Sequence, residues 1–190
     1  MTLISIWCRH IGDNIIGIGN NIPWNIPSDL RRFRKITQGK TIVVGKKTYE
    51  SFPNKTLPNR NIIVLTSNNN YNVSDEDRHI TISNIDKISL FSDDVYIAGG
   101  SSVYNAFFSS EKYSPDVVVD CVFKGKLFDN LQGQAVDVSN SVEVLVSKYI
   151  KYEETFELDN VETNIWVKKK EYLDLDVTKN IINYLRTERN

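Results

Sequence analysis

The sequence predicts an α/β fold: a mostly parallel, eight-stranded central sheet with flanking helices and a C-terminal antiparallel hairpin. Short runs of β-branched and aliphatic residues alternate along the chain with helical segments, which is typical of βαβ units. Several runs, such as Ile62–Leu65 and Val117–Val119, are apolar throughout, as in strands covered on both faces. A chain of 190 residues can bury one such core, so a single domain is expected.

Each expected strand is a β-rich run bounded by polar or turn-forming residues. In chain order these runs are Leu3–Cys8, Thr41–Val44, Asn61–Thr66, His79–Ile82, Val95–Ala98, Val117–Phe123, Val142–Ile150 and Asn164–Lys169. The polar turn near Leu158–Asn160 predicts that the last two strands form the hairpin at the sheet edge. Loops are expected at residues 68–70 and 74–77.

Helices are expected between these strands, over Ser28–Thr37, Lys47–Phe52, Ile85–Phe91 and Ser101–Ser109. A domain over residues 1–170 is followed by an extension over 171–190, in which apolar residues recur at helical spacing: Val177, Ile181, Ile182 and Leu185. Such a stripe predicts a helix packed on the body of the domain rather than one that takes part in catalysis.

Composition excludes several classes of function. Lys and Arg number 23 against 24 Asp and Glu, so the net charge of -1 gives no basic field for nucleic acid. Cys8 and Cys121 lack a CxxC context, and two histidines cannot supply a usual zinc set, so no metal is expected. No run approaches membrane-spanning length, and Met1–Trp7 lacks a basic leader. The sequence therefore predicts a soluble, cytoplasmic protein with reduced thiols.

The segment from Ile15 to Phe33 carries the strongest functional signal. A glycine-bounded loop runs through Trp24 into a helix whose first turn holds an acid, Asp29, one turn before Phe33. This spacing places both side chains on one helical face. A carboxylate beside an aromatic wall suits a flat heterocycle with paired N–H donors. Alternatively, Asp29 or Ser28 only caps the helix.

Three expected strand ends carry groups suited to phosphate. They are Gly45-Lys46-Lys47-Thr48, Thr66-Ser67, and Gly99-Gly100-Ser101-Ser102-Val103-Tyr104. Glycines let the backbone approach a pyrophosphate, and helix N-termini favour its charge. Lys46, Lys47, Thr66 and Ser67 are placed to hold a further monoester phosphate, which favours NADPH over NADH. Each piece alone has a plainer interpretation, as a tight turn or a solvated lysine pair, and the G-x-G-x-x-G fingerprint is absent.

These motifs together resemble dihydrofolate reductase over roughly Leu3 to Lys169. Gly45–Phe52 is similar to the family's G-x-x-T-x-x-S-[IF] motif, and Leu57-Pro58-Asn59-Arg60 to its L-P-G-R. The resemblance implies reduction of 7,8-dihydrofolate to tetrahydrofolate by NADPH, a step of one-carbon metabolism. It also implies binding of dihydrofolate and antifolates, no nucleic-acid or membrane partner, and a monomer, unless the tail mediates a dimer.

The resemblance also implies roles for matched positions. Asp29 is expected to bind the pterin, Trp24 to order a water beside it, and Arg60 to bind the carboxylate of the glutamate tail. The implied substrate-binding residues are Trp7, Cys8, Asp29, Leu30, Phe33, Arg34, Phe52, Leu57, Arg60 and Ala98. The implied cofactor-binding residues are Ile16, Gly17, Gly19, Asn20, Gly45, Lys46, Lys47, Thr48, Thr66, Ser67, Gly99, Gly100, Ser101, Ser102, Val103 and Tyr104.

Two departures from the family pattern bear on substrate choice. Ala98 replaces a bulky aliphatic residue, and Asp120 stands where threonine or serine is usual. If its strand has the family's register, Asp120 lies beside Asp29 as a third catalytic residue, and the two carboxylates share a proton. A shift of one residue instead turns Asp120 away and brings Cys121 or Val119 to the pocket. The alternatives for function are a reductase of another pterin or pyrimidine, and a non-catalytic binding module.

Overall fold

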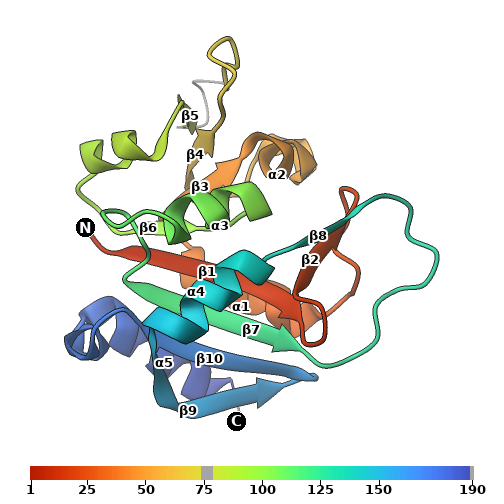
Figure 1. The fold of residues 1–190 in the computed structure, drawn as a ribbon, viewed down its shortest axis with the longest axis vertical. Coiled ribbons are helices and arrows are strands. Elements are labelled where there is room, and N and C mark those ends of the chain that lie inside the picture. Colours follow the sequence, from red (N-terminus) through yellow and green to blue (C-terminus); the bar gives the residue numbers. More distant parts are fainter. Residues whose placement is uncertain (74–78, 189–190) are drawn as a thin grey trace.

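The structure is a computed structural model that describes residues 1–73 and 79–188. An eight-stranded sheet, in the order β5-β4-β3-β6-β1-β7-β10-β9, forms its centre (Figure 1). Adjacent strands are parallel except at β10, which runs antiparallel to both β7 and β9. The predicted fold class is therefore confirmed. The strands of this sheet are β1 Leu3–His10, β3 Thr41–Gly45, β4 Asn61–Leu65, β5 His79–Ile82, β6 Val95–Ile97, β7 Val117–Phe123, β9 Ile150–Leu158 and β10 Val161–Val167.

Helices cover both faces of the sheet (Figure 1). One face packs against α1 (Pro27–Thr37) and α5 (Asp176–Thr187), whose buried isoleucines share a core cluster with Ile4 and Ile42. The opposite face packs against α3 (Ser101–Phe108) and α4 (Ser139–Lys148). The short helix α2 spans Lys46–Ser51, and 3-10 helices span Pro53–Lys55, Ile85–Leu90 and Lys170–Asp174.

The predicted strand at Val142–Ile150 is wrong, because most of this segment lies in α4. Valines alternate with polar residues there, a pattern that favours a strand when it is read alone. In the structure Ser141 and Leu145, four residues apart, are buried together, and Ser141 Oγ donates to Asn105 Oδ1 of α3 at 2.8 Å. Packing against α3 therefore overrides the local preference for a strand.

A second, two-stranded sheet was not predicted from the sequence. It pairs β2 (Ile15–Ile18) with β8 (Ala135–Asp137) in antiparallel fashion, beside the central sheet. The hairpin of β9 and β10 turns at Asp159-Asn160, as predicted. The predicted loop at 74–77, and the last two residues of the tail, lie outside the described residues.

Within residues 1–73 and 79–188, no helix is long and apolar enough to cross a membrane. The same residues place no cluster of three or more His, Cys, Asp or Glu side chains where it can hold a metal ion.

Candidate functional site

Helix α1 carries Asp29 in its first turn, where it lies close to Cys8 of β1. The helix begins at Pro27, and no side chain caps its N-terminus. The Ser28 hydroxyl is buried and has no hydrogen-bond partner among residues 1–73 and 79–188, so neither Ser28 nor Asp29 serves as the cap. Asp29 is instead half-buried and accepts a hydrogen bond from the Cys8 thiol of β1.

Burial raises the pKa of Asp29 from 3.8 to about 6. The charge of Arg32 and the hydrogen bond from Cys8 lower this pKa, and the carboxylate of Glu188 raises it. Loss of hydration disfavours the ionised form more strongly than the nearby cation favours it. A carboxyl group with this pKa changes its charge close to neutral pH, which suits a proton-handling group.

Apolar side chains from several elements share the core cluster beneath α1. Cys8, Phe33, Phe52, Leu57 and Ala98 are partly buried and pack against one core cluster, which also contains Trp24. Trp24 packs against Phe123 with their ring centroids 5.3 Å apart. Leu30, at 51% exposure, flanks Asp29 on α1. Whether these side chains and Asp29 form the substrate site stays a prediction.

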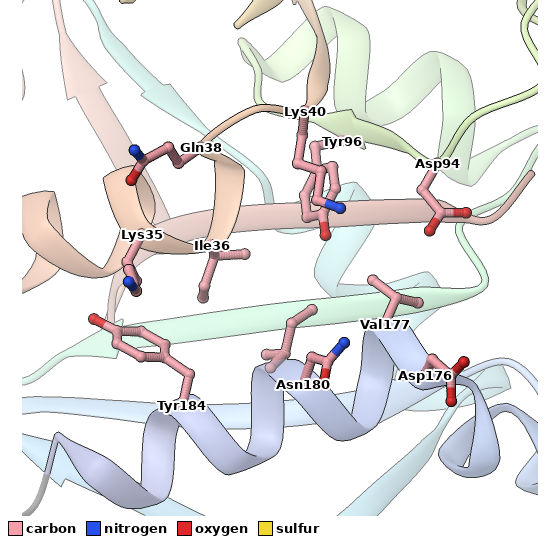
Figure 2. A pocket seen from close by; sticks show the side chains of 11 residues that line it. Lys35, Ile36, Gln38, Lys40, Asp94, Tyr96, Asp176, Val177, Asn180 and Tyr184 are labelled. Atoms are coloured by element: carbon pink, nitrogen blue, oxygen red, sulfur yellow. The ribbon is translucent and has the colours of Figure 1, made fainter. Parts of the chain in front are cut away.

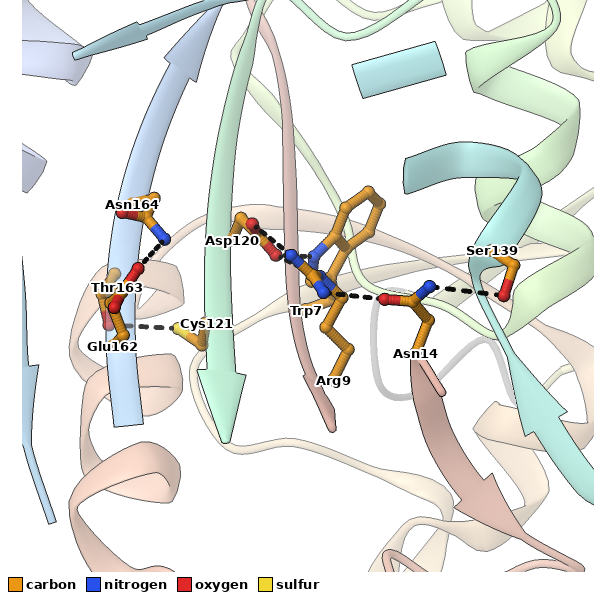
Figure 3. A network of polar contacts seen from close by, with 9 residues as sticks. All are labelled: Trp7, Arg9, Asn14, Asp120, Cys121, Ser139, Glu162, Thr163 and Asn164. Carbon is orange, nitrogen blue, oxygen red and sulfur yellow. Dashed lines mark hydrogen bonds and ion pairs between the residues drawn. The ribbon is translucent and has the colours of Figure 1, made fainter. Parts of the chain in front are cut away.

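The predicted pairing of Asp120 with Asp29 is wrong. In the register between β1 and β7, Trp7 lies opposite Asp120 and Cys8 opposite Cys121. Asp120 points to the face away from Asp29, where it accepts from Trp7 Nε1 at 2.6 Å and from Arg9 Nε at 2.8 Å (Figure 3). It is fully buried and forms an ion pair with Arg9. Asp120 is therefore held in a buried polar contact with Trp7 and Arg9 on the other face of the sheet from Asp29.

The Trp7 side chain is also misassigned to the substrate pocket. It packs edge-on against Tyr104 on the opposite face of the sheet, with ring centroids 5.1 Å apart. Cys121 takes the place that was expected for Asp120. It is buried in the same core cluster as Trp24, and the charge of Asp29 raises its pKa further above the value set by burial.

We expect Asp120→Asn to reduce stability strongly, because it leaves the Arg9 guanidinium without its carboxylate. Breaking a buried ion pair at one partner costs about 3–5 kcal/mol. Urea unfolding at neutral pH measures the loss. The matched control is Asp174→Asn, whose side chain is 84% exposed. Equal stability of the two variants would contradict the structural role of Asp120.

Arg60 lies at the C-terminal end of α1. Its guanidinium donates to the Arg34 carbonyl and to the Pro58 carbonyl, each at 2.6 Å, and to Thr37 Oγ1 at 3.3 Å. Burial lowers the pKa of Arg60, and the charge of Arg34 lowers it further. The backbone contacts fix the orientation of this cation, whereas the Arg34 side chain itself is exposed.

Two of the predicted phosphate-binding turns meet at the carboxyl ends of β3 and β6. The Gly45 amide donates to the Gly99 carbonyl at 2.7 Å. A Cβ atom on Gly100 would lie 3.2 Å from Thr48 Oγ1, and Gly99 has a φ of +106°. Side chains at these glycines would fill the space between the turns. The glycines therefore leave the backbone uncovered beside the start of α3.

The four candidate monoester-phosphate residues lie on neighbouring strand ends. Gly45 of β3 pairs in register with Leu65 of β4, so Lys46 and Lys47 follow one strand and Thr66 and Ser67 the next. Lys47 and Ser67 are exposed. Lys46 lies over the Tyr71 ring, with its Nζ atom 4.7 Å from the centroid, and 3.9 Å from a Glu50 oxygen. The group is positively charged and open to solvent.

The loop at Gly17–Asn21 packs against a segment that the sequence did not implicate. The Gly19 amide donates to the Gln134 carbonyl at 2.9 Å, and a Cβ atom on Gly19 would lie 2.8 Å from the Gln132 carbonyl oxygen. Ser101 Oγ donates to the Asp137 carbonyl at 2.6 Å. Residues 132–137 therefore connect this loop to the start of α3.

The sequence and the fold are similar to those of known proteins. The family model described as "Dihydrofolate reductase" matches residues 2–153. A dihydrofolate reductase of Staphylococcus aureus is 36% identical over 128 residues, which cover 67% of this chain and 77% of that protein. One of Enterococcus faecium is 33% identical over 129 residues, covering 66% and 75%. The solved dihydrofolate reductase of Enterococcus faecalis with NADP(H) and RAB-propyl has a TM-score of 0.69 at 22% identity, covering 87% of this chain and 95% of that one.

Proposed function

Because this chain belongs to the dihydrofolate reductase family, it reduces 7,8-dihydrofolate with NADPH, and we propose that the pterin binds against Asp29. The half-buried Asp29 carboxylate among apolar walls is the observation that supports this placement. As a carboxylate it accepts two parallel hydrogen bonds from the ring N3–H and the 2-amino group of the pterin. The walls formed by Phe33, Phe52 and Leu57 keep water from the ring.

Asp29 is also proposed to hold the proton that the reaction transfers to N5. Its pKa of about 6 means that the protonated and ionised forms both occur near neutral pH. The protonated form holds a proton inside the pocket, whereas the ionised form orients the pterin. Trp24, buried beside the pocket, is proposed to order the water through which the proton reaches N5. We expect hydride transfer in the wild-type protein to slow as pH rises through this range.

The paired glycine turns fit a dinucleotide. Space for a backbone-bound pyrophosphate is kept by Gly45, Gly99 and Gly100, and the eight-residue helix α3 begins directly beside them. When bound, NADPH supplies the hydride that adds to C6 of the pterin. Further members of the site are proposed to be Ile16, Gly17, Gly19, Asn20, Thr48, Ser101, Ser102, Val103 and Tyr104. Tyr104 is buried, and its hydroxyl donates to the Ile6 carbonyl at 2.7 Å. Its proposed role is therefore to pack beneath the cofactor rather than to bind it through the hydroxyl.

We expect the double change Lys46→Ala and Lys47→Ala to weaken NADPH binding by about tenfold and NADH binding much less. Solvent-exposed charge pairs each contribute about 1 kcal/mol or less, and only NADPH carries the additional phosphate. Fluorescence titration with both cofactors measures the difference. Lys169→Ala with Lys170→Ala, on an exposed segment before α5, is the control. Equal weakening of both cofactors would assign the lysines to the pyrophosphate or to the fold.

The proposed pocket is tested by following NADPH oxidation with dihydrofolate, with and without methotrexate. Turnover that requires dihydrofolate and is abolished by methotrexate is the expected result. NADPH binding without turnover of dihydrofolate would instead favour a different pterin or pyrimidine as substrate. If the protein neither binds NADPH nor turns over dihydrofolate, that result would favour a non-catalytic module.

We infer further that the enzyme acts as a monomer in the cytoplasm. The apolar stripe of α5 is already covered by its own sheet, because Ile181, Ile182 and Leu185 are each at most 5% exposed. The extension therefore does not offer this stripe to a second copy. Cys8 and Cys121 are free thiols, as expected in a reducing compartment. Size-exclusion chromatography with light scattering measures the oligomeric state.

A further inference from the structure

The C-terminal helix α5 lies beside α1, on the sheet face that carries Asp29. Its residues Ile181, Ile182 and Leu185 belong to the same core cluster as Ile36 of α1. Lys35 and Ile36 of α1, with Tyr184 and Asn180 of α5, line a hollow of about 400 Å³. Figure 2 shows these side chains between the two helices. The family match covers residues 2–153, and α5 lies after it in the chain.

A buried cation joins the two helices. Arg32 follows Asp29 by three residues, so both side chains leave α1 on one face. Arg32 is 1% exposed, and its Nε donates to Glu188 Oε2, just after α5, at 2.8 Å. The Tyr184 hydroxyl donates to the other Glu188 oxygen at 2.6 Å. Both oxygens of this carboxylate are therefore engaged.

We propose that Glu188 is a positioning residue for the reaction, which holds the Arg32 guanidinium against the C-terminal helix and so prevents it from neutralising Asp29. This proposal rests on the assignment of Asp29 as the pterin-binding acid. A buried arginine needs a carboxylate partner, because an unpaired charge is costly away from water. Without Glu188, the remaining acid on the Arg32 face of α1 is Asp29. An Arg32–Asp29 pair would occupy the oxygens that the pterin needs.

The charges that surround Asp29 support this division of roles. The titratable and charged groups coupled to it are Cys8 from β1, Cys121 from β7, Tyr104 from α3, Arg32 from α1 and Glu188 after α5. Arg31 is exposed on α1, and its charge lowers the pKa of Tyr184. After burial, the largest influence on the pKa of Asp29 is Arg32, which lowers it; Glu188 raises it by a smaller amount. Removal of the Glu188 charge alone should therefore shift the titration of Asp29 toward acid.

The test compares wild type with Glu188→Gln, the double variant Arg32→Gln with Glu188→Gln, and the control Glu171→Gln. Glu171 is on the same extension, and its side chain is 71% exposed. Two readouts are taken across pH: the side-chain carboxyl carbon of Asp29 by NMR in the ligand-free protein, and the single-turnover rate of NADPH oxidation. We expect Glu188→Gln to lower both midpoints by about half to one pH unit, the scale of a charge interaction across a partly buried gap.

The double variant should move both midpoints the other way, above those of wild type, because the stronger influence of Arg32 is lost together with that of Glu188. The control should match wild type. A Glu188→Gln protein that folds and titrates as wild type does would overturn the proposal. If Glu188→Gln does not fold, the double variant decides: an Asp29 midpoint at or below that of wild type would also overturn the proposal. A wild type without dihydrofolate turnover would contradict the proposed function, whereas the NMR midpoints would still decide the coupling.

Discussion

Asp29→Asn is expected to reduce turnover of dihydrofolate about 100-fold to 10,000-fold while the fold and NADPH binding remain. The amide cannot accept two parallel hydrogen bonds from the pterin, and it cannot hold the proton that N5 receives. General acid–base contributions to catalysis are of this size. Stopped-flow kinetics of hydride transfer, together with a fluorescence titration of NADPH, measure the two effects separately.

The same substitution is expected to alter how stability depends on pH. The pKa of Asp29 is about 6 in the folded protein, against an ordinary value of 3.8. The folded state therefore binds more protons than the unfolded state between these values, and stability falls as pH rises from about 4 to about 6. The shift corresponds to about 2–3 kcal/mol. Asp29→Asn should lack this decline and should exceed wild type in stability at pH above about 7.

Urea unfolding at acidic and neutral pH measures this gain, and Asp174→Asn serves as the exposed control. The activity of wild type should fall through the titration of Asp29, whereas the residual rate of Asp29→Asn should not follow it. Near-normal turnover in Asp29→Asn would move the active site elsewhere. A variant that is inactive and also less stable than wild type at neutral pH would contradict the raised pKa.

Arg60→Leu is expected to raise KM for dihydrofolate about tenfold to a hundredfold, with little change in kcat. A charge-assisted hydrogen bond contributes about 1.5–3 kcal/mol, and the glutamate tail carries the carboxylate that makes it. A pterin without this tail should bind Arg60→Leu and wild type equally. Steady-state kinetics with dihydrofolate measure the effect on the tailed substrate, and a binding titration measures the effect on the tail-less pterin.

Because Arg60 also binds the Arg34 and Pro58 carbonyls, the control must separate charge from structure. Lys40→Leu removes a positive charge near the same end of α1, where the Lys40 amide donates to the Thr37 carbonyl at 3.1 Å. It should leave KM unchanged. Equal losses for tailed and tail-less ligands in Arg60→Leu would remove Arg60 from the substrate site and assign it to the end of α1.

Local patterns in the sequence determined most of the framework. Continuous apolar runs marked the central strands, glycines after two of them marked the turns that meet at Gly45 and Gly99, and the stripe in the tail marked α5. The acid in the first turn of α1 and the aromatic residue one turn later are the local pattern on which the proposed pterin site rests. Each of these signals depends on neighbours within a few residues, where spacing alone sets the shared face.

Only the tertiary structure decided which side chains share a space. Successive residues of a strand face opposite sides, so a single step in the register of β1 and β7 sends Asp120 to Arg9 and brings Cys121 toward Asp29. No local pattern in the sequence determines how β1 and β7 pair. Arg32 and Glu188 are 156 positions apart in sequence, yet they form one buried ion pair. Their contact depends on how α5 packs across the sheet, because burial and charge pairing are properties of the folded core rather than of neighbouring residues.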